Sequence, residues 1–327
     1  MASYTRRIQL TGGSTYIISL PSKWIRESRL EKGSELTIDE TNGNLLLSYG
    51  GLAKSELIKK VNIDGKVDLE NFQRALTSIY ISDFDTLIIK STQYIDQPLR
   101  ETVKRFSRLV MGVEIFEESS RTIVLQNVLD SASFPMANAV RRMSLNVETM
   151  IGDVIKGMED NDKKLLESVI SRDDDVDRYQ LYVYRVVNRR MIDNENSVFF
   201  LIFSRILERI ADHAVNICKI WGAGEQSGEK NTKLIVGFLK RASTLYNEAV
   251  EAFYSRKFEV LNAIISKKPE FISTKQEILK TIGDSQFSYS ASSISEEALR
   301  IALYATDIAE LAMDIILGAQ SEFTISS

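Results

Sequence analysis

The sequence contains very little cysteine and very little histidine. Its 327 residues include one cysteine, Cys218, and one histidine, His213. A single cysteine excludes a disulfide within the chain and a thiolate metal cluster, and a single histidine excludes a zinc site built from several histidines. Few cysteines are typical of proteins that work in a reducing compartment, so we expect a cytoplasmic protein.

Long apolar runs and nucleophile motifs are also missing. No apolar stretch approaches the roughly 20 residues of a membrane-spanning helix, and the first residues contain no apolar signal-peptide segment. The chain has no Gly-x-Ser-x-Gly motif, and Gly12-Gly13 is not followed by the Lys-Ser/Thr of a phosphate-binding loop. These absences argue against membrane insertion, and we expect no enzymatic activity.

The charges of the chain are unevenly distributed. The formal net charge is -4, yet the first thirty residues carry five cations and one anion. The cations are Arg6, Arg7, Lys23, Arg26 and Arg29, and the anion is Glu27. A basic end on an acidic body predicts that this end alone contacts a polyanion. The alternative is that these charges form an ordinary solvated surface.

The sequence of the basic end predicts a small β-rich domain. We expect an extended segment at 6–10, a turn at Gly12-Gly13 and a strand at 15–20, because β-branched and aromatic residues favour strands. A short helix at 22–29 follows. Asn42-Gly43, between two apolar runs, predicts a tight hairpin turn.

Four segments of this end, TGGS, YIISLP, SKWIRES and LEKGSELTI, resemble the AbrB/SpoVT family of DNA-binding domains. Members form interleaved dimers, since so short a β unit cannot close a core alone. The resemblance implies promoter DNA and a second copy of the chain as partners. The candidate DNA contacts are Arg6, Arg7, Ser14, Thr15, Lys23 and Arg26. Many members carry a lysine in the first turn, where this chain has Gly12-Gly13.

Residues 55–130 alternate between strand and helix patterns. The segments IKKVNI, TLIIKS, GVEIFE and TIVLQN predict strands, and 69–81 and 98–110 predict helices. The order βαβαββ is typical of a small α/β module. No catalytic motif occurs in it, so we expect a linker or a dimerisation module.

From residue 131 onward the pattern is helical and repeats itself. LLESVISR (165–172) aligns with VLNAIISK (260–267), and a polar, glycine-rich segment at 222–231 separates the two copies. We predict an all-α pair of three-helix bundles. The expected domains are 1–50, 55–130, 131–221 and 231–321.

Two predicted helices direct carboxylates toward a core. In the helix at 163–191, Asp173 and Asp177 occupy the centre of the apolar stripe, and Glu208 and Asp212 repeat the four-residue spacing in the next helix. An unpaired buried carboxylate costs on the order of several kcal/mol. Packed antiparallel, the two helices bring four carboxylates together, an oxygen donor set that suits Mg, Mn or Fe.

Less specific interpretations exist for each of these residues. The two aspartates pair with Arg205 and Arg209 in a buried network without metal, or Glu208 pairs with Arg205 on the surface. We expect His213 to be a packed or capping side chain rather than a ligand. We expect Cys218 to be a small core residue.

The segments DDDVDRYQLYVYR (173–185) and ERIADHAVNI (208–217) resemble motifs of the PhoU family, and the likeness extends over 131–320. PhoU proteins consist of two similar three-helix bundles, whose E/D-xxx-D motifs bind clusters of iron or other metals. The resemblance implies one such metal cluster in the first bundle. Its ligands would be Asp173, Asp177, Glu208 and Asp212.

The second bundle departs from this pattern. At the positions of Asp173, Asp177 and Glu208 it has Lys268, Ile272 and Leu303. Asp307 keeps the carboxylate of Asp212, and Glu310-xxx-Asp314 has no acidic pair opposite it. We therefore expect at most one metal cluster, with the Lys268 ammonium replacing the charge of a cation in the second bundle.

A DNA-binding end joined to a PhoU-like body resembles the archaeal type of phosphate uptake regulator. The resemblance implies transcriptional regulation of phosphate-transporter genes, with sensing through metal occupancy or through contact with the transporter ATPase. One alternative is a PhoU-like adaptor that contacts a transporter or signalling protein without binding DNA. A remote alternative is a carboxylate-bridged metallophosphatase, which needs a pocket and a separate general base that the sequence does not show.

Overall fold

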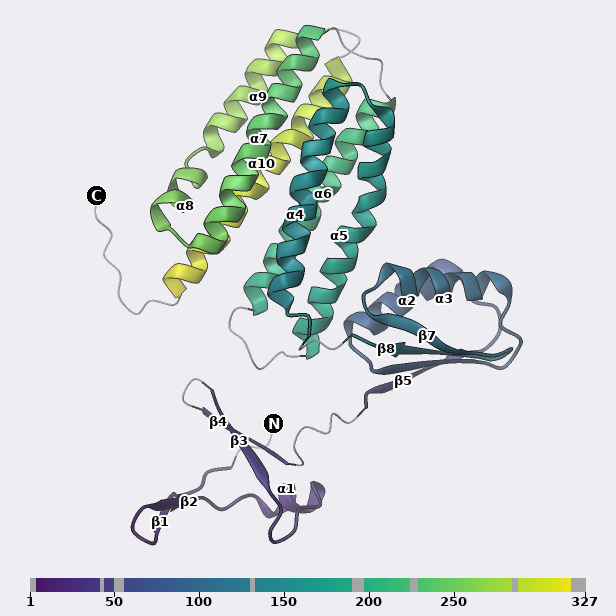
Figure 1. Ribbon diagram of the computed structural model, residues 1–327, viewed down its shortest axis with the longest axis vertical. Helices are drawn as coiled ribbons and strands as arrows, with labels where there is room; N and C mark the ends of the chain where they lie inside the picture. Colours follow the sequence, from purple (N-terminus) through teal and green to yellow (C-terminus); the bar gives the residue numbers. More distant parts are fainter. Residues whose placement is uncertain are drawn as a thin grey trace. The chain divides into compact units, whose positions relative to one another are not determined.

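The computed structural model describes residues 4–41, 44–49, 56–129, 133–189, 197–223, 229–283 and 288–318. The chain divides into two compact units, Met1–Leu57 and Ile58–Ser327. The first contains short strands and one short helix, and the second contains an α/β layer and a set of long helices (Figure 1). The predicted classes of the three regions, β-rich, α/β and all-α, are confirmed.

The N-terminal unit contains two antiparallel strand pairs and a helix. Its elements are β1 (Gln9–Thr11), β2 (Thr15–Ile17), α1 (Ser22–Glu27), β3 (Leu36–Thr41) and β4 (Asn44–Tyr49). Gly12 and Gly13 join β1 to β2 with φ angles of +64° and +85°, a conformation that glycine adopts without steric cost. The strands are shorter than expected, since β1 begins at Gln9 rather than at residue 6. The Asn42-Gly43 turn lies outside the described residues.

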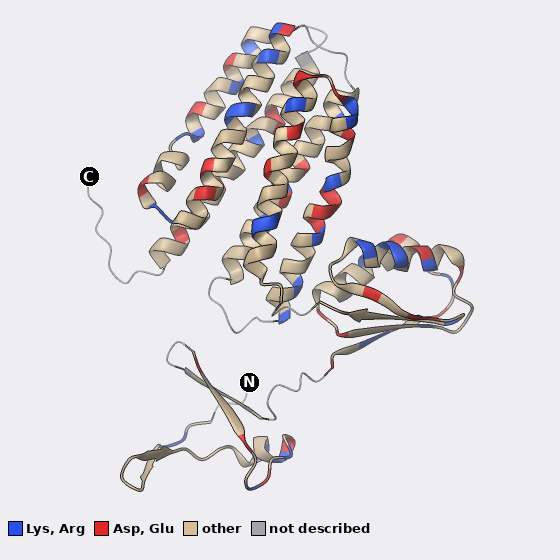
Figure 2. Cartoon of the chain, in the orientation of Figure 1, with Lys and Arg blue, Asp and Glu red and all other residues tan. Residues whose placement is uncertain are grey.

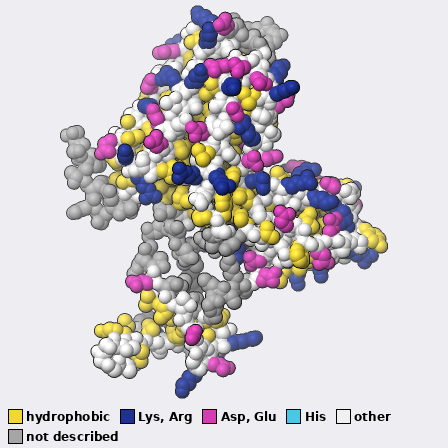
Figure 3. Space-filling view, in the orientation of Figure 1, with side chains coloured by type: hydrophobic (Ala, Val, Ile, Leu, Met, Phe, Trp, Pro, Cys, Tyr) yellow, Lys and Arg dark blue, Asp and Glu magenta, His cyan; other side chains and the backbone are white. Residues whose placement is uncertain are grey.

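The described residues of this unit enclose no hydrophobic core. Helix α1 has no buried residue and carries charges of both signs (Figure 2). Apolar side chains of the strands lie on the surface, with Tyr16 73% exposed and Ile38 59% exposed (Figure 3). Trp24 and Tyr49 form an edge-to-face pair with ring centres 5.8 Å apart. A single copy of this unit thus buries too little apolar surface to form a core.

The second unit begins with a four-stranded sheet. Its elements are β5 (Ile58–Ile63), α2 (Leu69–Ile81), β6 (Thr86–Ser91), α3 (Gln97–Leu109), β7 (Val113–Glu118) and β8 (Thr122–Asn127). The predicted βαβαββ order is confirmed. In space the strands follow the order β5-β6-β8-β7, with β5 and β6 parallel and β8 antiparallel to both of its neighbours.

Helices α2 and α3 cover one face of this sheet (Figure 1). Their first turns are capped by Asp68 and Asp96, whose carboxylates accept hydrogen bonds from backbone N–H groups. Leu76, Tyr80 and Phe106 from the helices pack on the strands and are almost fully buried. The α/β layer therefore has its own core.

The described residues that follow form seven helices. They are α4 (Met136–Glu159), α5 (Lys163–Arg189), α6 (Ser197–Ala223), α7 (Glu229–Ser255), α8 (Phe258–Ile265), α9 (Lys268–Ile282) and α10 (Ser288–Gly318). The first three form one bundle and the last four form a second (Figure 1). Among the described helices, none combines the length and the apolar character of a membrane-spanning segment.

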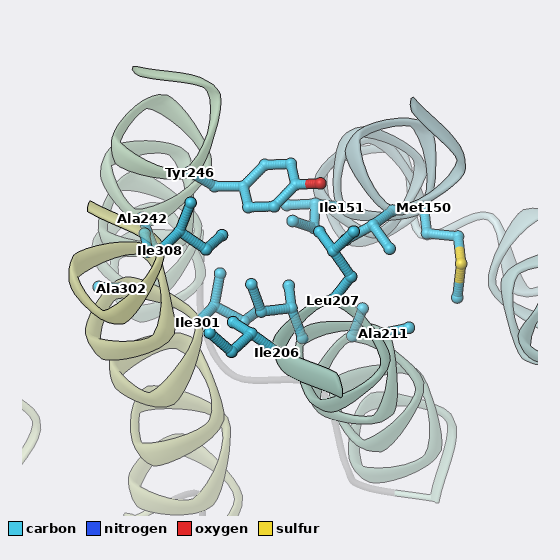
Figure 4. Packing of buried hydrophobic residues seen from close by; sticks show 14 of the residues in the cluster. Met150, Ile151, Ile206, Leu207, Ala211, Ala242, Tyr246, Ile301, Ala302 and Ile308 are labelled. Atoms are coloured by element: carbon cyan, nitrogen blue, oxygen red, sulfur yellow. The ribbon is translucent and has the colours of Figure 1, made fainter. Parts of the chain in front are cut away.

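The two bundles share one apolar core. Side chains of α4, α6, α7 and α10 meet between them, among them Ile151, Leu207 and Ile301 (Figure 4). The Tyr246 hydroxyl of α7 donates a hydrogen bond of 2.8 Å to the Ser144 carbonyl oxygen of α4. The repeat thus folds as two bundles that are packed against each other.

The second bundle differs from the first in one helix. The counterpart of α5 is divided into α8 and α9, with Pro269 in the first turn of α9. Proline lacks the backbone N–H and its ring clashes with the carbonyl group four residues earlier, so a continuous helix is disfavoured there. The expected three-helix repeat therefore has a broken middle helix in its second copy.

A buried ion pair joins the α/β layer to α5. Arg185 Nε lies 2.6 Å from Asp83 Oδ1, and both side chains are almost fully buried. The same guanidinium donates to the Phe84 carbonyl oxygen at 3.0 Å and lies over the Tyr80 ring. Arg189 reaches the other oxygen of Asp83 at 3.1 Å. These contacts fix the α/β layer on the C-terminal part of α5.

We expect Arg185→Met to destabilise the protein by about 3 kcal/mol, because it removes the main counter-charge of a buried carboxylate. Thermal or urea unfolding measures the loss. Adding Asp83→Asn should recover part of it. The control is Arg74→Ala, which breaks an exposed pair with Glu70 and should cost less than about 1 kcal/mol. Equal losses in the two arginine variants would contradict the structural role of Arg185.

Candidate functional site

The four carboxylates that the sequence singles out lie together in the first bundle. Asp173 and Asp177 come from α5, and Glu208 and Asp212 come from α6, which packs along it. Each aspartate of α5 is close enough to both acids of α6 for their charges to raise its pKa. The predicted convergence of two helices on one acidic cluster is therefore present in the structure.

Burial and mutual repulsion shift the pKa values of this cluster upward. Loss of hydration is the largest cause for Asp173, followed by the charges of Asp212 and Glu208, and its pKa rises to about 6. Loss of hydration, followed by the charges of Asp173, Glu208 and Asp212, raises the pKa of Asp177 to about 7. Asp173 is half-buried, whereas Asp177 is exposed, so the predicted place of Asp177 at the centre of the apolar stripe is wrong. Lys219 opposes the shift at Asp173.

The arginines of α6 pair with Glu208 and not with the aspartates. Arg205 Nη1 lies 3.2 Å from Glu208 Oε1, and Arg209 Nε lies 3.9 Å from Glu208 Oε2. Burial and Asp212 raise the pKa of Glu208, and the two arginines oppose that rise. The alternative pairing of these arginines with Asp173 and Asp177 is not formed, whereas the alternative Arg205–Glu208 pair is.

Two carboxylate oxygens of the cluster are buried without a hydrogen bond. They are Asp173 Oδ1 and Glu208 Oε2. Buried polar atoms in proteins nearly always have a partner, so the Asp173 oxygen points to a missing positive group, whereas the Glu208 oxygen has the Arg209 guanidinium 3.9 Å away. Their chemistry fits a hard cation such as Mg, Mn or Fe. Among the described residues, however, no three His, Cys, Asp or Glu side chains are arranged as ligands of a common ion.

The second bundle carries a different charge arrangement at the equivalent place. Asp307 stands where the first bundle has Asp212, and burial followed by the charge of Glu310 raises its pKa. Lys268, at the position of Asp173, opposes that rise. The charge of Lys268 therefore acts on the retained carboxylate in the second bundle.

His213 and Cys218 have structural roles. The imidazole Nδ1 of His213 hydrogen-bonds to the Glu297 carboxylate of α10, and the ring stacks on Tyr304 with centres 5.6 Å apart. Asn216 donates to the same carboxylate at 3.4 Å. Cys218 is almost fully buried, and burial raises the pKa of its thiol to about 12. Both residues are packed, as expected, and neither belongs to the acidic cluster.

The connection between the acidic cluster and the α/β layer is not apparent from the sequence motifs. Beyond Asp173 and Asp177, every fourth residue of α5 contacts the α/β layer. Leu181 packs on its core, and Arg185 and Arg189 pair with Asp83. The four-residue spacing of these three side chains continues that of the aspartates and is the one signal that sequence reasoning could have used.

The six candidate DNA contacts are all exposed and lie on three segments of the N-terminal unit. Arg6 and Arg7 precede β1, and the Arg6 guanidinium lies over the Tyr4 ring. Ser14 lies in the turn before β2, and Thr15 is the first residue of β2. Lys23 and Arg26 lie on α1, where the Lys23 ammonium is 3.9 Å from the Glu27 carboxylate. Exposed cations and hydroxyl groups of this kind are able to contact phosphates.

We expect the metal-free protein to unfold at a lower temperature near pH 8 than near pH 5 because of this cluster. The folded-state pKa values of about 6 and about 7 lie above the ordinary value of 3.8, so ionisation opposes folding. That penalty is absent at low pH and is fully present above the folded-state pKa. Thermal unfolding in the presence of a chelator, recorded between pH 5 and pH 8, measures how the unfolding temperature depends on pH.

Asp173→Asn should flatten this pH dependence. The matched control is Asp175→Asn, which removes an exposed carboxylate paired with Arg178 on the same helix. The same pH dependence in both variants would show that the acidic cluster carries no such penalty.

Comparison with known proteins gives two regional matches. Residues 9–49 match the family model of the antidote-toxin recognition protein MazE, a bacterial antitoxin, and residues 140–221 match the PhoU domain. The second range contains all four carboxylates of the cluster. The first contains Ser14, Thr15, Lys23 and Arg26, whereas Arg6 and Arg7 lie before it. No curated protein matches the chain.

Solved structures of PhoU proteins resemble the chain. The phosphate transport system regulatory protein PhoU from Streptococcus pneumoniae has 15% identity and a TM-score of 0.50, over 57% of this chain and 96% of that chain. PhoU from Pseudomonas aeruginosa has 16% identity and a TM-score of 0.43, over 56% and 96%. The chain thus joins a MazE/AbrB-type domain at its N-terminus to a PhoU domain in its C-terminal helical region.

Proposed function

We propose that this protein is a DNA-binding transcriptional regulator of phosphate uptake. The observation that carries the proposal is the presence of both domains in one chain. A PhoU domain fits regulation of phosphate transport, and a MazE/AbrB-type domain fits DNA binding. In this proposal the helical region senses the phosphate state in the cytosol, and the N-terminal unit contacts promoter DNA.

The proposed DNA-bound form is a homodimer. The exposed apolar side chains of the N-terminal unit support this, because pairing with a second copy would bury surface that one copy leaves in water. A dimer also presents twice the number of cations to the duplex. Arg6, Arg7, Lys23 and Arg26 then act mainly on phosphates, so binding should be strongly salt-dependent.

We propose that Asp173, Asp177, Glu208 and Asp212 hold a cation of the Mg, Mn or Fe type. A bound cation would supply positive charge to the buried oxygen of Asp173, which has no hydrogen bond. Because the present side-chain positions form no ligand set, the carboxylates would rotate about their side-chain torsions to bind it. Arg205 and Arg209 already compensate part of the charge of Glu208. The two aspartates have no such arginine, so a bound cation would compensate mainly their charges.

Helix α5 offers a route from the cluster to the rest of the chain. It carries Asp173 and Asp177 and, further along, Arg185, which is locked to Asp83 of the α/β layer. A change in charge at the aspartates therefore acts on the same rigid element that holds the α/β layer. Such coupling requires two states of the protein with different affinities for the cation or a transporter partner.

The DNA-binding proposal predicts salt-dependent binding to promoter DNA of phosphate-transporter genes. The variant Arg6→Ala with Arg7→Ala should bind more weakly to every sequence. Its logarithmic salt slope should be shallower by about two per copy, because each phosphate contact contributes about one. Mobility-shift titrations at several salt concentrations measure both effects.

Arg74→Ala, an exposed arginine of α2, is the control and should bind like the unmodified protein. An unmodified protein that shows no salt-dependent DNA binding would contradict the regulator and favour the adaptor. That adaptor would act by contact with a transporter or signalling protein alone.

The metal proposal predicts that the purified protein binds Mn²⁺ or Fe²⁺. The variants Asp173→Asn and Glu208→Gln should each lower the affinity for the metal at least about tenfold, because each removes one charged ligand. Calorimetric titration measures the affinity for the metal, and elemental analysis measures the metal content. Asp175→Asn, an exposed carboxylate of α5 paired with Arg178, is the control and should bind normally. Equal binding by all three variants would exclude this cluster as the site.

A further inference from the structure

The sheet of the α/β layer has one face that no described element of its unit covers. Helices α2 and α3 lie on the opposite face, where Leu87, Ile89, Ile123 and Leu125 are almost fully buried (Figure 1). Alternation along each strand assigns the neighbouring residues to the uncovered face. They include Ile58, Lys60 and Asn62 of β5, Ile88 and Lys90 of β6, Thr122, Val124 and Gln126 of β8, and Glu114 and Glu117 of β7.

This face is apolar in the middle and carries opposite charges at its two sides. The strand register aligns Lys60 with Ile88, Ile88 with Val124, and Val124 with Glu117. A line across the sheet therefore runs from a cation through two β-branched apolar side chains to an anion. Lys90 adds a second cation on the β5–β6 side, and Glu114 adds a second anion on β7.

A bulge in β7 places one of these anions on the uncovered face. The register shifts between Ile115 and Glu117, so the intervening Phe116 is extra, and its side chain is 70% exposed. Without the bulge, alternation from Glu114 would turn Glu117 toward α2 and α3. With it, Glu117 is opposite Val124, and Glu118 turns instead to the covered face, where it pairs with Arg100 of α3.

The four charged side chains have no ion-pair partner among the described residues. Lys60, Lys90, Glu114 and Glu117 are all exposed, and none forms a salt bridge with a described group. By contrast, exposed charges on the two helices of the layer pair with each other, as in Arg74 with Glu70. Lysines on one side and glutamates on the other are thus available to a surface with the reversed order of charges.

We propose that this sheet face is a symmetric interface with a second copy of the same chain. A twofold axis parallel to the strands sets the β5 edge of one copy against the β7 edge of the other. Lys60 then faces Glu117 of the second copy, and Ile88 faces its Val124. An in-plane axis across the strands would set lysine against lysine, so the charges select the first arrangement. Sheets packed in this way lie about 10 Å apart.

This interface goes beyond the proposed function. It joins the α/β layers of two chains, and therefore the α5 helices locked to them, whether or not the N-terminal unit binds DNA. The pairing of N-terminal units is a separate contact. Molecular mass alone does not distinguish the two contacts, so the test needs a cross-link at the sheet face.

The test uses two oppositely altered full-length chains. The acidic chain carries Lys60→Glu and Lys90→Glu, and the basic chain carries Glu114→Lys and Glu117→Lys. Two acidic chains, or two basic chains, present like charges at both sides of the interface. One acidic chain with one basic chain restores attraction at both sides.

The readout is a cross-link between differently tagged, co-expressed copies, one with Ile88→Cys and one with Val124→Cys, joined by a short bismaleimide. Cys218 is 2% exposed and should not react. We expect the cross-link in otherwise unmodified chains, about a tenfold loss in acidic–acidic and basic–basic pairs, and its return in the acidic–basic pair. That return also shows that both altered chains are folded.

The control reverses the exposed charges of α3 with Glu101→Lys and Lys104→Glu on the covered side of the layer, and it should leave the cross-link unchanged. The proposal is overturned if like-charged pairs cross-link as well as unmodified chains. It is also overturned if the acidic–basic pair does not regain the cross-link.

Discussion

The negative charge held between α5 and α6 is the constraint on which the account of this protein depends. Asp173 is half-buried, Asp177 lies one turn further along α5 and is exposed, and each is repelled by acids from the facing helix. One oxygen of Asp173 is buried with no hydrogen bond, although arginines lie nearby on Glu208. The helices are held together by apolar contacts on either side of the cluster, so the fold tolerates a local repulsion that a cation would relieve.

The second bundle shows that this charge is not a requirement of the architecture. It packs the same way around the same shared core, but it has Lys268, Ile272 and Leu303 at the positions of three of the acids. There the retained Asp307 is opposed by Lys268. The helix that would correspond to α5 is also broken at this place by Pro269. A continuous helix with an unneutralised acidic pair is thus specific to the first copy, which is the copy attached to the α/β layer through Arg185 and Asp83.

Local patterns made much of this fold predictable. The bounds of β5, β6, β8 and α2 agree with those expected, because apolar alternation, aspartate caps and glycine turns are all encoded within a few residues. The acidic cluster was also predictable, since its four-residue spacing is local. What depends on distant residues was not. Asp83 and Arg185 are far apart in the sequence, and the insertion of β8 between β6 and β7 follows from tertiary contacts.

The most direct test of the central claim is a high-resolution crystal structure of Mn²⁺-soaked or Fe²⁺-soaked protein, with anomalous diffraction recorded at the absorption edge of the metal. We expect an anomalous peak between α5 and α6, with carboxylate oxygens of Asp173 and Glu208 turned toward it. The absence of a peak, with Asp173 and Asp177 held by arginines or surrounded by bulk water, would contradict it.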